Sequence, residues 1–353
     1  IPIVHPMLVD VNLPGSATFQ VRVKNWSEQL REVTLASSGE GIETNLPSSN
    51  LQLPPGVEKI VDLSVALLKG TGVYRLSVKI EGPGFQAAED ITIAAVAERE
   101  SLAYAFDYDR DGFDDVILEN RDLRCFVSPR AGGRSFAFVR KETNDNAFDS
   151  VGGMRDNFTT RFEPADMQGL PDWTTEKWLG LYNRPYLFRI VSAFGKEAEV
   201  AFEYEAPDIY PKGIRLKRTL SLAGDQDMLV ESTSITPHAK KKPQSFVFET
   251  SVPFRVFDHP NYNQWFAEGR PALDFEPGKN IDLPAGLRFI GTHNRTTGET
   301  LTAVLLTKPR AVQIVAEAHS ALFRIVYPNF SGSNRTFTYT VGYSFARQMP
   351  SEP

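Results

Sequence analysis

Apolar and polar residues alternate with a period of two along most of this chain. In residues 17–24 the odd positions from Phe19 to Val23 are apolar and the even positions are polar, which predicts a strand with one buried face. Similar runs occur in residues 32–36, 58–65, 72–80 and 90–96. Clusters of Gly, Pro and Ser separate these runs, so the first part of the chain is predicted to form a small β-sandwich.

A charged segment, residues 97–101, is interpreted as a linker, with one domain predicted at residues 1–98 and a second at residues 99–353. Further alternating runs lie at residues 116–119, 123–128, 135–139, 187–192, 197–204, 214–221, 228–236, 246–254, 287–291, 300–307, 311–316, 322–327 and 336–345. Strands and helices do not alternate, which argues against nucleotide-binding and barrel α/β folds. The sequence therefore predicts an all-β chain whose second domain is one large sandwich.

The most specific local feature is an acidic loop with the sequence DYDRDGFDD. Its aspartates are Asp107, Asp109, Asp111 and Asp115, and Gly112 allows a sharp turn. Calcium prefers six to eight oxygen ligands, and alternate carboxylates in a tight loop converge on one point. The bidentate glutamate of an EF-hand is missing, because Leu118 occupies that position. Two interpretations remain: a structural calcium site made by the four aspartates, or a polar turn whose aspartates cap backbone amides.

Two aromatic-rich stretches are candidates for sugar binding. The first lies within residues 157–186, which show no clean period, and the second spans residues 258–266. Flat aromatic rings stack on the apolar faces of sugars while neighbouring polar groups bond the hydroxyls. The candidate carbohydrate-binding residues are Trp173, Trp178, Tyr182, Tyr186, His259, Tyr262 and Trp265. The alternative is that these aromatics are buried against the sandwich and anchor loops.

Composition narrows the functional classes. The formal net charge of −6 argues against a nucleic-acid partner, because affinity for phosphates comes from clustered Lys and Arg. No run reaches the ~20 apolar residues that a spanning helix needs, so no membrane span is expected. Cys125 is the only cysteine, so the chain has no internal disulfide, and its place in an alternating run predicts a buried thiol. The chain begins at Ile1 with no initiator Met, from which we expect a processed or excised piece, with either a signal peptide removed or a partner catalytic domain missing.

The acidic loop and the segment after it resemble the start of the C-terminal β-sandwich of family-57 glycoside hydrolases, which include 4-α-glucanotransferases and α-amylases. The resemblance runs over FDYDRDGFDDVILENRDLRCFVSPRAGGRSFAF. The matching positions are Asp107, Asp109, Asp111, Gly112, Asp115, Val116, Leu118, Asn120, Pro129, Gly132, Gly133 and Phe136. The first domain resembles the immunoglobulin-like domains found beside bacterial glycoside hydrolases, through FQVRVKNWS, LPPGVEKIVDLSV and GTGVYRLSVKI.

The resemblance implies a large galactose-mutarotase-like super-β-sandwich in a carbohydrate context. In that family the catalytic carboxylates lie in an N-terminal barrel that this chain lacks, so no catalytic residue is carried over. We therefore expect a non-catalytic accessory region of a glycoside-hydrolase-type protein, bacterial and secreted, periplasmic or on the cell surface, with a polysaccharide or oligosaccharide as partner.

Two alternatives from other classes remain. The first is a stand-alone sugar-active enzyme, an epimerase or a polysaccharide lyase, that works in a groove of the large sandwich; the five histidines fall in no motif typical of mutarotases. The second is a structural cell-surface or interaction protein. An enzyme needs convergent ionisable groups in a concave site, a binding module needs exposed aromatic rings, and a structural module needs neither.

Overall fold

The computed structural model describes residues 3–4, 7–148, 155–161, 176–180, 184–206, 214–237, 245–254, 263–273, 278–316, 321–327 and 336–347. Within these ranges the chain forms strands throughout, and the one helical element is the short 3-10 turn η1 (Pro129–Ala131). The prediction of an all-β protein is confirmed. The strands form five sheets, and none of these sheets contains strands from both sides of residues 98–100.

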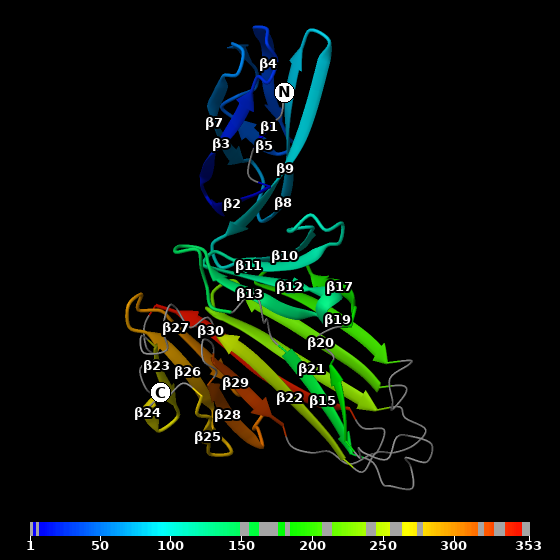
Figure 1. Cartoon of the computed structure of the whole chain (residues 1–353), viewed down its shortest axis with the longest axis vertical. Coiled ribbons are helices and arrows are strands. Elements are labelled where there is room, and N and C mark those ends of the chain that lie inside the picture. The colour runs from blue at the N-terminus through cyan, green and yellow to red at the C-terminus, as the bar shows by residue number, and fades with distance from the viewer. Residues whose placement is uncertain are drawn as a thin grey trace.

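Two sheets form the N-terminal sandwich (Figure 1). The four-stranded sheet has the order β1 (Ile3–Val4), β3 (Ser16–Lys24), β7 (Glu58–Leu67), β5 (Ile42–Thr44). The five-stranded sheet has the order β2 (Leu8–Leu13), β9 (Phe85–Ala97), β8 (Gly72–Gly82), β4 (Arg31–Ser38), β6 (Ser49–Leu53). The predicted inward positions of β3 are correct, since Val21 and Val23 are fully buried against Leu63 and Leu76 of the same core.

A nine-stranded sheet forms the base of the large sandwich. Its order is β17 (Leu187–Ser192), β19 (Glu197–Ala206), β20 (Ile214–Ala223), β21 (Met228–Pro237), β30 (Phe337–Ala346), β27 (Thr300–Val304), β26 (Phe289–Asn294), β23 (Asn263–Ala267), β24 (Arg270–Leu273). Alternate residues of its strands, such as Val200, Leu220 and Phe345, point into one core.

Two six-stranded sheets cover that core. One has the order β14 (Asp145–Asn146), β13 (Arg134–Arg140), β12 (Leu123–Ser128), β11 (Asp115–Asn120), β10 (Ser101–Phe106), β18 (Phe194–Gly195). The other has the order β16 (Glu176–Gly180), β15 (Arg155–Arg161), β22 (Ser245–Phe254), β29 (Ala321–Val326), β28 (Ala311–Ala316), β25 (Ile281–Leu283). Phe138 of the first sheet and Phe323 of the second belong to the same apolar cluster, so both sheets pack on one face of the nine-stranded sheet.

The N-terminal sandwich rests on the outer face of the β10–β13 sheet (Figure 1). Ala94 and Val96 of β9 share a buried apolar cluster with Tyr104, Ile117 and Phe126. This second buried face explains why every residue of β11 is buried. The two sandwiches therefore meet through a packed interface.

Two sequence predictions can be compared with this fold directly. Residues 157–186 show no clean period in the sequence, but most of β15 and all of β16 lie there and pair with each other in antiparallel register. Cys125 is fully buried, which confirms the predicted buried thiol, and burial raises its pKa to about 12.

Candidate functional site

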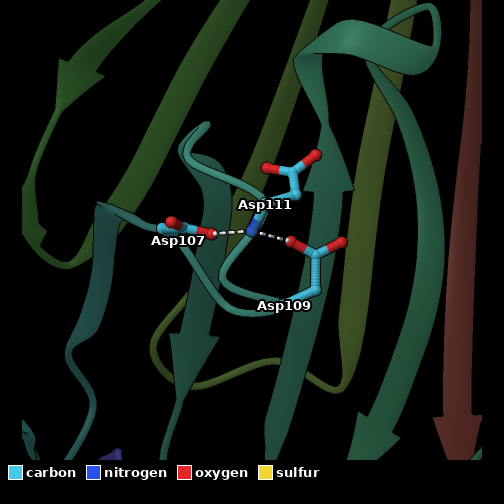
Figure 2. A group of neighbouring side chains, drawn as sticks. All are labelled: Asp107, Asp109 and Asp111. Carbon is cyan, nitrogen blue, oxygen red and sulfur yellow. Dashed lines mark hydrogen bonds between the residues drawn. The ribbon is translucent and has the colours of Figure 1, made fainter.

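The acidic loop joins β10 to β11 and folds around its own aspartates (Figure 2). The backbone N–H of Asp111 donates to Asp107 Oδ1 at 3.1 Å and to Asp109 Oδ1 at 3.2 Å. The N–H of Gly112 donates to Asp107 Oδ2 at 3.0 Å, and Gly112 has a φ of 87°, which a glycine adopts without strain. Hydrogen bonds from backbone N–H groups to the carboxylates thus stabilise the turn, as expected for a polar turn whose aspartates cap backbone amides.

The same loop also fits the other interpretation. Carboxylate oxygens of Asp107, Asp109 and Asp111 all lie within 4.8 Å of one another. A calcium ion bound to oxygens at about 2.3–2.6 Å places opposite ligands about 5 Å apart, so the three carboxylates can reach one ion. Arg130 lies at the edge of the loop, where its Nη1 is 3.3 Å from Asp111 Oδ2 and its guanidinium is stacked over Phe113.

Asp115 occupies a different position from the other three aspartates. It begins β11 and is 8% exposed, and it is not among the three carboxylates that converge. Its pKa is raised to about 7, mainly by burial and next by the negative charges of Asp109, Asp111 and Asp107, against a lowering by a hydrogen bond with Ser128. The ionisation of Asp115 therefore depends on the charge of the acidic loop that precedes it.

The predicted sugar-stacking role is wrong for Tyr186 and Trp265. Tyr186 is 4% exposed and is stacked on Tyr204, with 5.1 Å between ring centroids. Trp265 is fully buried and packs edge-on against Phe323. A sugar in solution cannot reach either ring, so both are anchors of the core, as the alternative interpretation holds.

The remaining candidates are placed only in part. Trp178 lies in β16, opposite Thr159 of β15, and its side chain lies outside the described residues. Four candidates lie wholly outside the described ranges: Trp173, Tyr182, His259 and Tyr262.

A groove that sequence analysis missed lies on the outer face of the nine-stranded sheet, with a volume of about 360 Å³. Its floor is a row of residues on four neighbouring strands, in which Leu187 is opposite Glu203, Glu203 is opposite Lys217, and Lys217 is opposite Ser234. Arg215, Glu205 and Thr236 continue the groove in the next row. The charged residues alternate along β19 and β20, but only the strand register shows that they meet.

A second ionisable cluster lies where β14 approaches the turn between β26 and β27. Glu299 is 3% exposed and accepts hydrogen bonds from Thr143 Oγ1 at 3.0 Å and from Thr297 Oγ1 at 3.2 Å. Burial raises its pKa, and so do the charge and hydrogen bond of Asp145. Two carboxyls in hydrogen-bond contact are closer than the pair of a glycosidase, which is separated by about 5–9.5 Å.

Comparison with known proteins identifies the fold. No model of a protein family matches the sequence, and no curated protein matches it. Among solved structures, the chain is similar to a galactose mutarotase related enzyme from Lactobacillus acidophilus, with a TM-score of 0.51 and 10% identity, over 66% of this chain and 97% of that one. The large sandwich is galactose-mutarotase-like. At this identity the likeness shows the fold alone.

Two other solved structures are similar at lower scores. One is a galactose mutarotase-like protein from Lactobacillus casei, with a TM-score of 0.49, 11% identity, and coverage of 66% of this chain and 100% of that one. The other is a 4-alpha-glucanotransferase from Thermococcus litoralis, with a TM-score of 0.46, 11% identity, and coverage of 69% of this chain and 39% of that one.

The described part of the chain contains no helix long and apolar enough to cross a membrane.

Proposed function

We propose that this chain is a glycan-binding accessory region of a carbohydrate-processing protein whose catalytic domain lies elsewhere. The observation that supports this function best is the groove on the outer face of the mutarotase-like sheet. Its volume of about 360 Å³ lies within the range of ligand sites, which runs from about 300 to 1,000 Å³.

The groove offers the chemistry that a sugar needs. The Arg215 guanidinium and the Glu205 carboxylate form an ion pair at 3.0 Å, and both remain more than half exposed. Together with Lys217 they provide donors and acceptors for sugar hydroxyls. Leu187, which is 82% exposed, supplies an apolar surface for a ring face at the edge of the groove.

Hydroxyl groups extend this surface beyond the groove. Ser234 and Thr338 are hydrogen bonded at 2.8 Å across β21 and β30, and Thr236 and Thr336 are bonded in the same way at 2.9 Å. A glycan longer than the groove would meet a flat polar surface rather than an apolar one. The site therefore favours an extended chain with several sugar rings.

The double variant R215A/K217A is expected to bind its glycan at least ten-fold more weakly than the unmodified chain, a loss of about 1.4 kcal/mol. The measurement is a titration with maltoheptaose, cellohexaose, galactan and polygalacturonate, with simultaneous assay for released products. Arg75→Ala is the matched control, because this exposed arginine lies on the N-terminal sandwich. If R215A/K217A binds with the same affinity as the unmodified chain, the groove is not the glycan-binding site. Release of products would favour an enzyme. No binding to any glycan would favour a structural protein.

We further propose that Asp107, Asp109 and Asp111 hold a structural calcium ion. The loop also contacts the N-terminal sandwich, where Arg110 Nε approaches Met7 Sδ at 3.0 Å. An ion would fix the loop at the junction of the two sandwiches. Calcium sites of extracellular modules are weak, with a Kd of about 10⁻⁴–10⁻³ M, which suits a secreted, periplasmic or cell-surface location.

Calcium is expected to raise the midpoint of thermal unfolding by roughly 5 °C at concentrations about 100-fold above its Kd. Differential scanning calorimetry with calcium and with a chelator measures this shift. Asp109→Asn removes one of the three carboxylates and should abolish the shift, whereas Asp225→Asn, in an exposed turn, should leave it unchanged. The same midpoint in calcium and in chelator would identify the loop as a polar turn.

A further inference from the structure

Trp26 is 68% exposed on the N-terminal sandwich. Large aromatic side chains contribute strongly to stability when they are buried, and a tryptophan exposed to this extent forgoes most of that contribution. It lies two residues after the end of β3, in the loop that leads to β4. The ring therefore contributes little to the core of the N-terminal sandwich.

The loop that carries Trp26 is held in one conformation by the residue before it. Asn25 is fully buried, and its Nδ2 donates to the carbonyl oxygens of Leu53 and Gln29, both at 2.8 Å. Its Oδ1 accepts bonds from the backbone N–H and the hydroxyl of Ser27, at 3.0 and 2.8 Å. A side chain on a fixed loop loses little conformational entropy when a ligand binds.

One face of the Trp26 ring already has a partner. The ammonium group of Lys24 lies 3.6 Å from the ring centroid, in the geometry of a cation–π contact. This contact restricts the orientation of the indole and occupies one of its faces. Because most of the side chain remains exposed, the opposite face is open for stacking.

Polar side chains continue from Trp26 along the outer face of the four-stranded sheet. Thr18, Gln20 and Arg22 occupy alternate exposed positions of β3. Across the sheet, Gln20 Nε2 donates to Asp62 Oδ1 at 3.5 Å, and Thr18 Oγ1 and Ser64 Oγ are bonded at 2.8 Å. At the strand rise of about 3.3 Å per residue, Lys24 to Thr18 on β3 spans about 20 Å, the length of several sugar rings.

We propose that this surface, the Trp26 face, formed by Thr18, Gln20, Arg22, Lys24, Trp26 and Asp62, is a second glycan-binding site, on which a pyranose ring stacks on the open side of Trp26. The proposal rests on the proposed function, which it extends to the N-terminal sandwich. This face carries the charged residues Arg22, Lys24 and Asp62, and one exposed apolar residue, Ile60, lies opposite Arg22 on β7. An aromatic ring followed by a row of amide, hydroxyl and charged groups suits a hydroxyl-rich ligand.

The two sites would act together on a long glycan. The N-terminal sandwich is packed on the β10–β13 sheet, so the Trp26 face and the groove are held at a fixed separation. Two linked sites that engage one polymer bind more tightly than either site alone, whereas a short ligand gains nothing from the second site. The full chain is therefore expected to prefer polymers over oligosaccharides of the same sugar.

Trp26→Ala, made in the full chain, tests the proposal by titration with maltoheptaose, cellohexaose, galactan and polygalacturonate. We expect a loss of affinity of at least ten-fold for the polymer that binds, with affinity largely restored in Trp26→Tyr, which keeps a flat ring. Leu30→Ala is the matched control, because Leu30 is 54% exposed and lies just before β4, outside the Trp26 face. The exposed position of Trp26 makes unfolding of the variant unexpected, and circular dichroism checks this.

The possible outcomes separate the two hypotheses. A Trp26→Ala chain with unchanged affinity for a glycan whose binding R215A/K217A weakens would overturn the Trp26 face and leave the proposed function intact. No glycan binding by the unmodified chain would overturn both. Aromatic side chains next to basic residues also bind single-stranded nucleic acid, so binding of oligo(dT) that Trp26→Ala abolishes, without glycan binding, would overturn the glycan assignment.

Discussion

Replacement of Glu119 by alanine is expected to lower the free energy of unfolding by about 3–5 kcal/mol. Glu119 is fully buried in β11, and its Oε2 lies 2.7 Å from Arg124 Nη2 and 3.2 Å from Lys141 Nζ. The Tyr104 hydroxyl donates to Oε1 at 3.0 Å. Removal of this carboxylate leaves two cationic groups buried beside each other, and neither can be fully hydrated without opening of the interface. Chemical denaturation at neutral pH measures the loss.

Glu205→Ala is the matched control for this prediction. Glu205 is also paired with an arginine, since its Oε2 is 3.0 Å from Arg215 Nε, but both side chains are more than half exposed. Exposed pairs contribute about 0–1 kcal/mol, so this variant should be nearly as stable as the unmodified chain. If Glu119→Ala and Glu205→Ala lower the free energy of unfolding by the same amount, the buried network does not stabilise the interface.

The same network links the two sandwiches, because Arg124 of β12 also pairs with Asp10 of β2. Together with the apolar cluster around Ile117, this pair couples the stability of one sandwich to that of the other. One thermal transition is therefore expected for the unmodified chain. Glu119→Ala is expected to separate it into two, which calorimetry can resolve.

The alternating pattern was sufficient to predict the strands that have one solvent-exposed face. In β3 the buried and exposed residues follow the period of two over Val21, Arg22 and Val23. In contrast, β11 is buried on both faces, so its ends Asp115 and Asn120 look polar in the sequence although they are inside the molecule. A local pattern cannot show that a second sandwich packs on a strand, because that contact involves residues far away in the chain.

The candidate site was predictable only where its residues are local. The three converging aspartates lie within five consecutive residues, and their spacing alone brought them together. The groove depends instead on the register between β17, β19, β20 and β21, which the spacing of charges does not fix. Tyr186 and Trp265 show the same limit for aromatic rings, since an aromatic residue near a loop has the same sequence signal whether it points into the core or into solvent.

The stability of the calcium-free chain is expected to depend on the ionisation of Asp115. Its pKa is about 7 in the folded protein, against an ordinary value of 3.8. Between these pH values the folded protein binds more protons than the unfolded chain, so the contribution of Asp115 to stability falls as pH rises from about 4 to about 7 and is constant above that. Each pKa unit corresponds to about 1.4 kcal/mol, which gives a loss of a few kcal/mol, an upper bound because Asp109 and Asp111 are exposed to water.

Asp115→Asn isolates this effect from the titration of other groups. The variant keeps an acceptor for Ser128 but carries no charge, so the difference in unfolding free energy between the variant and the unmodified chain should rise with pH over this window and then level off. Urea denaturation in chelator at five pH values from 4 to 8 measures this difference. Calcium should reduce the difference, because a cation held by Asp107, Asp109 and Asp111 offsets the charges that disfavour ionised Asp115. A difference that does not change with pH would show that Asp115 titrates normally, and a difference that changes with pH but not with calcium would show that the loop carries its charge without an ion.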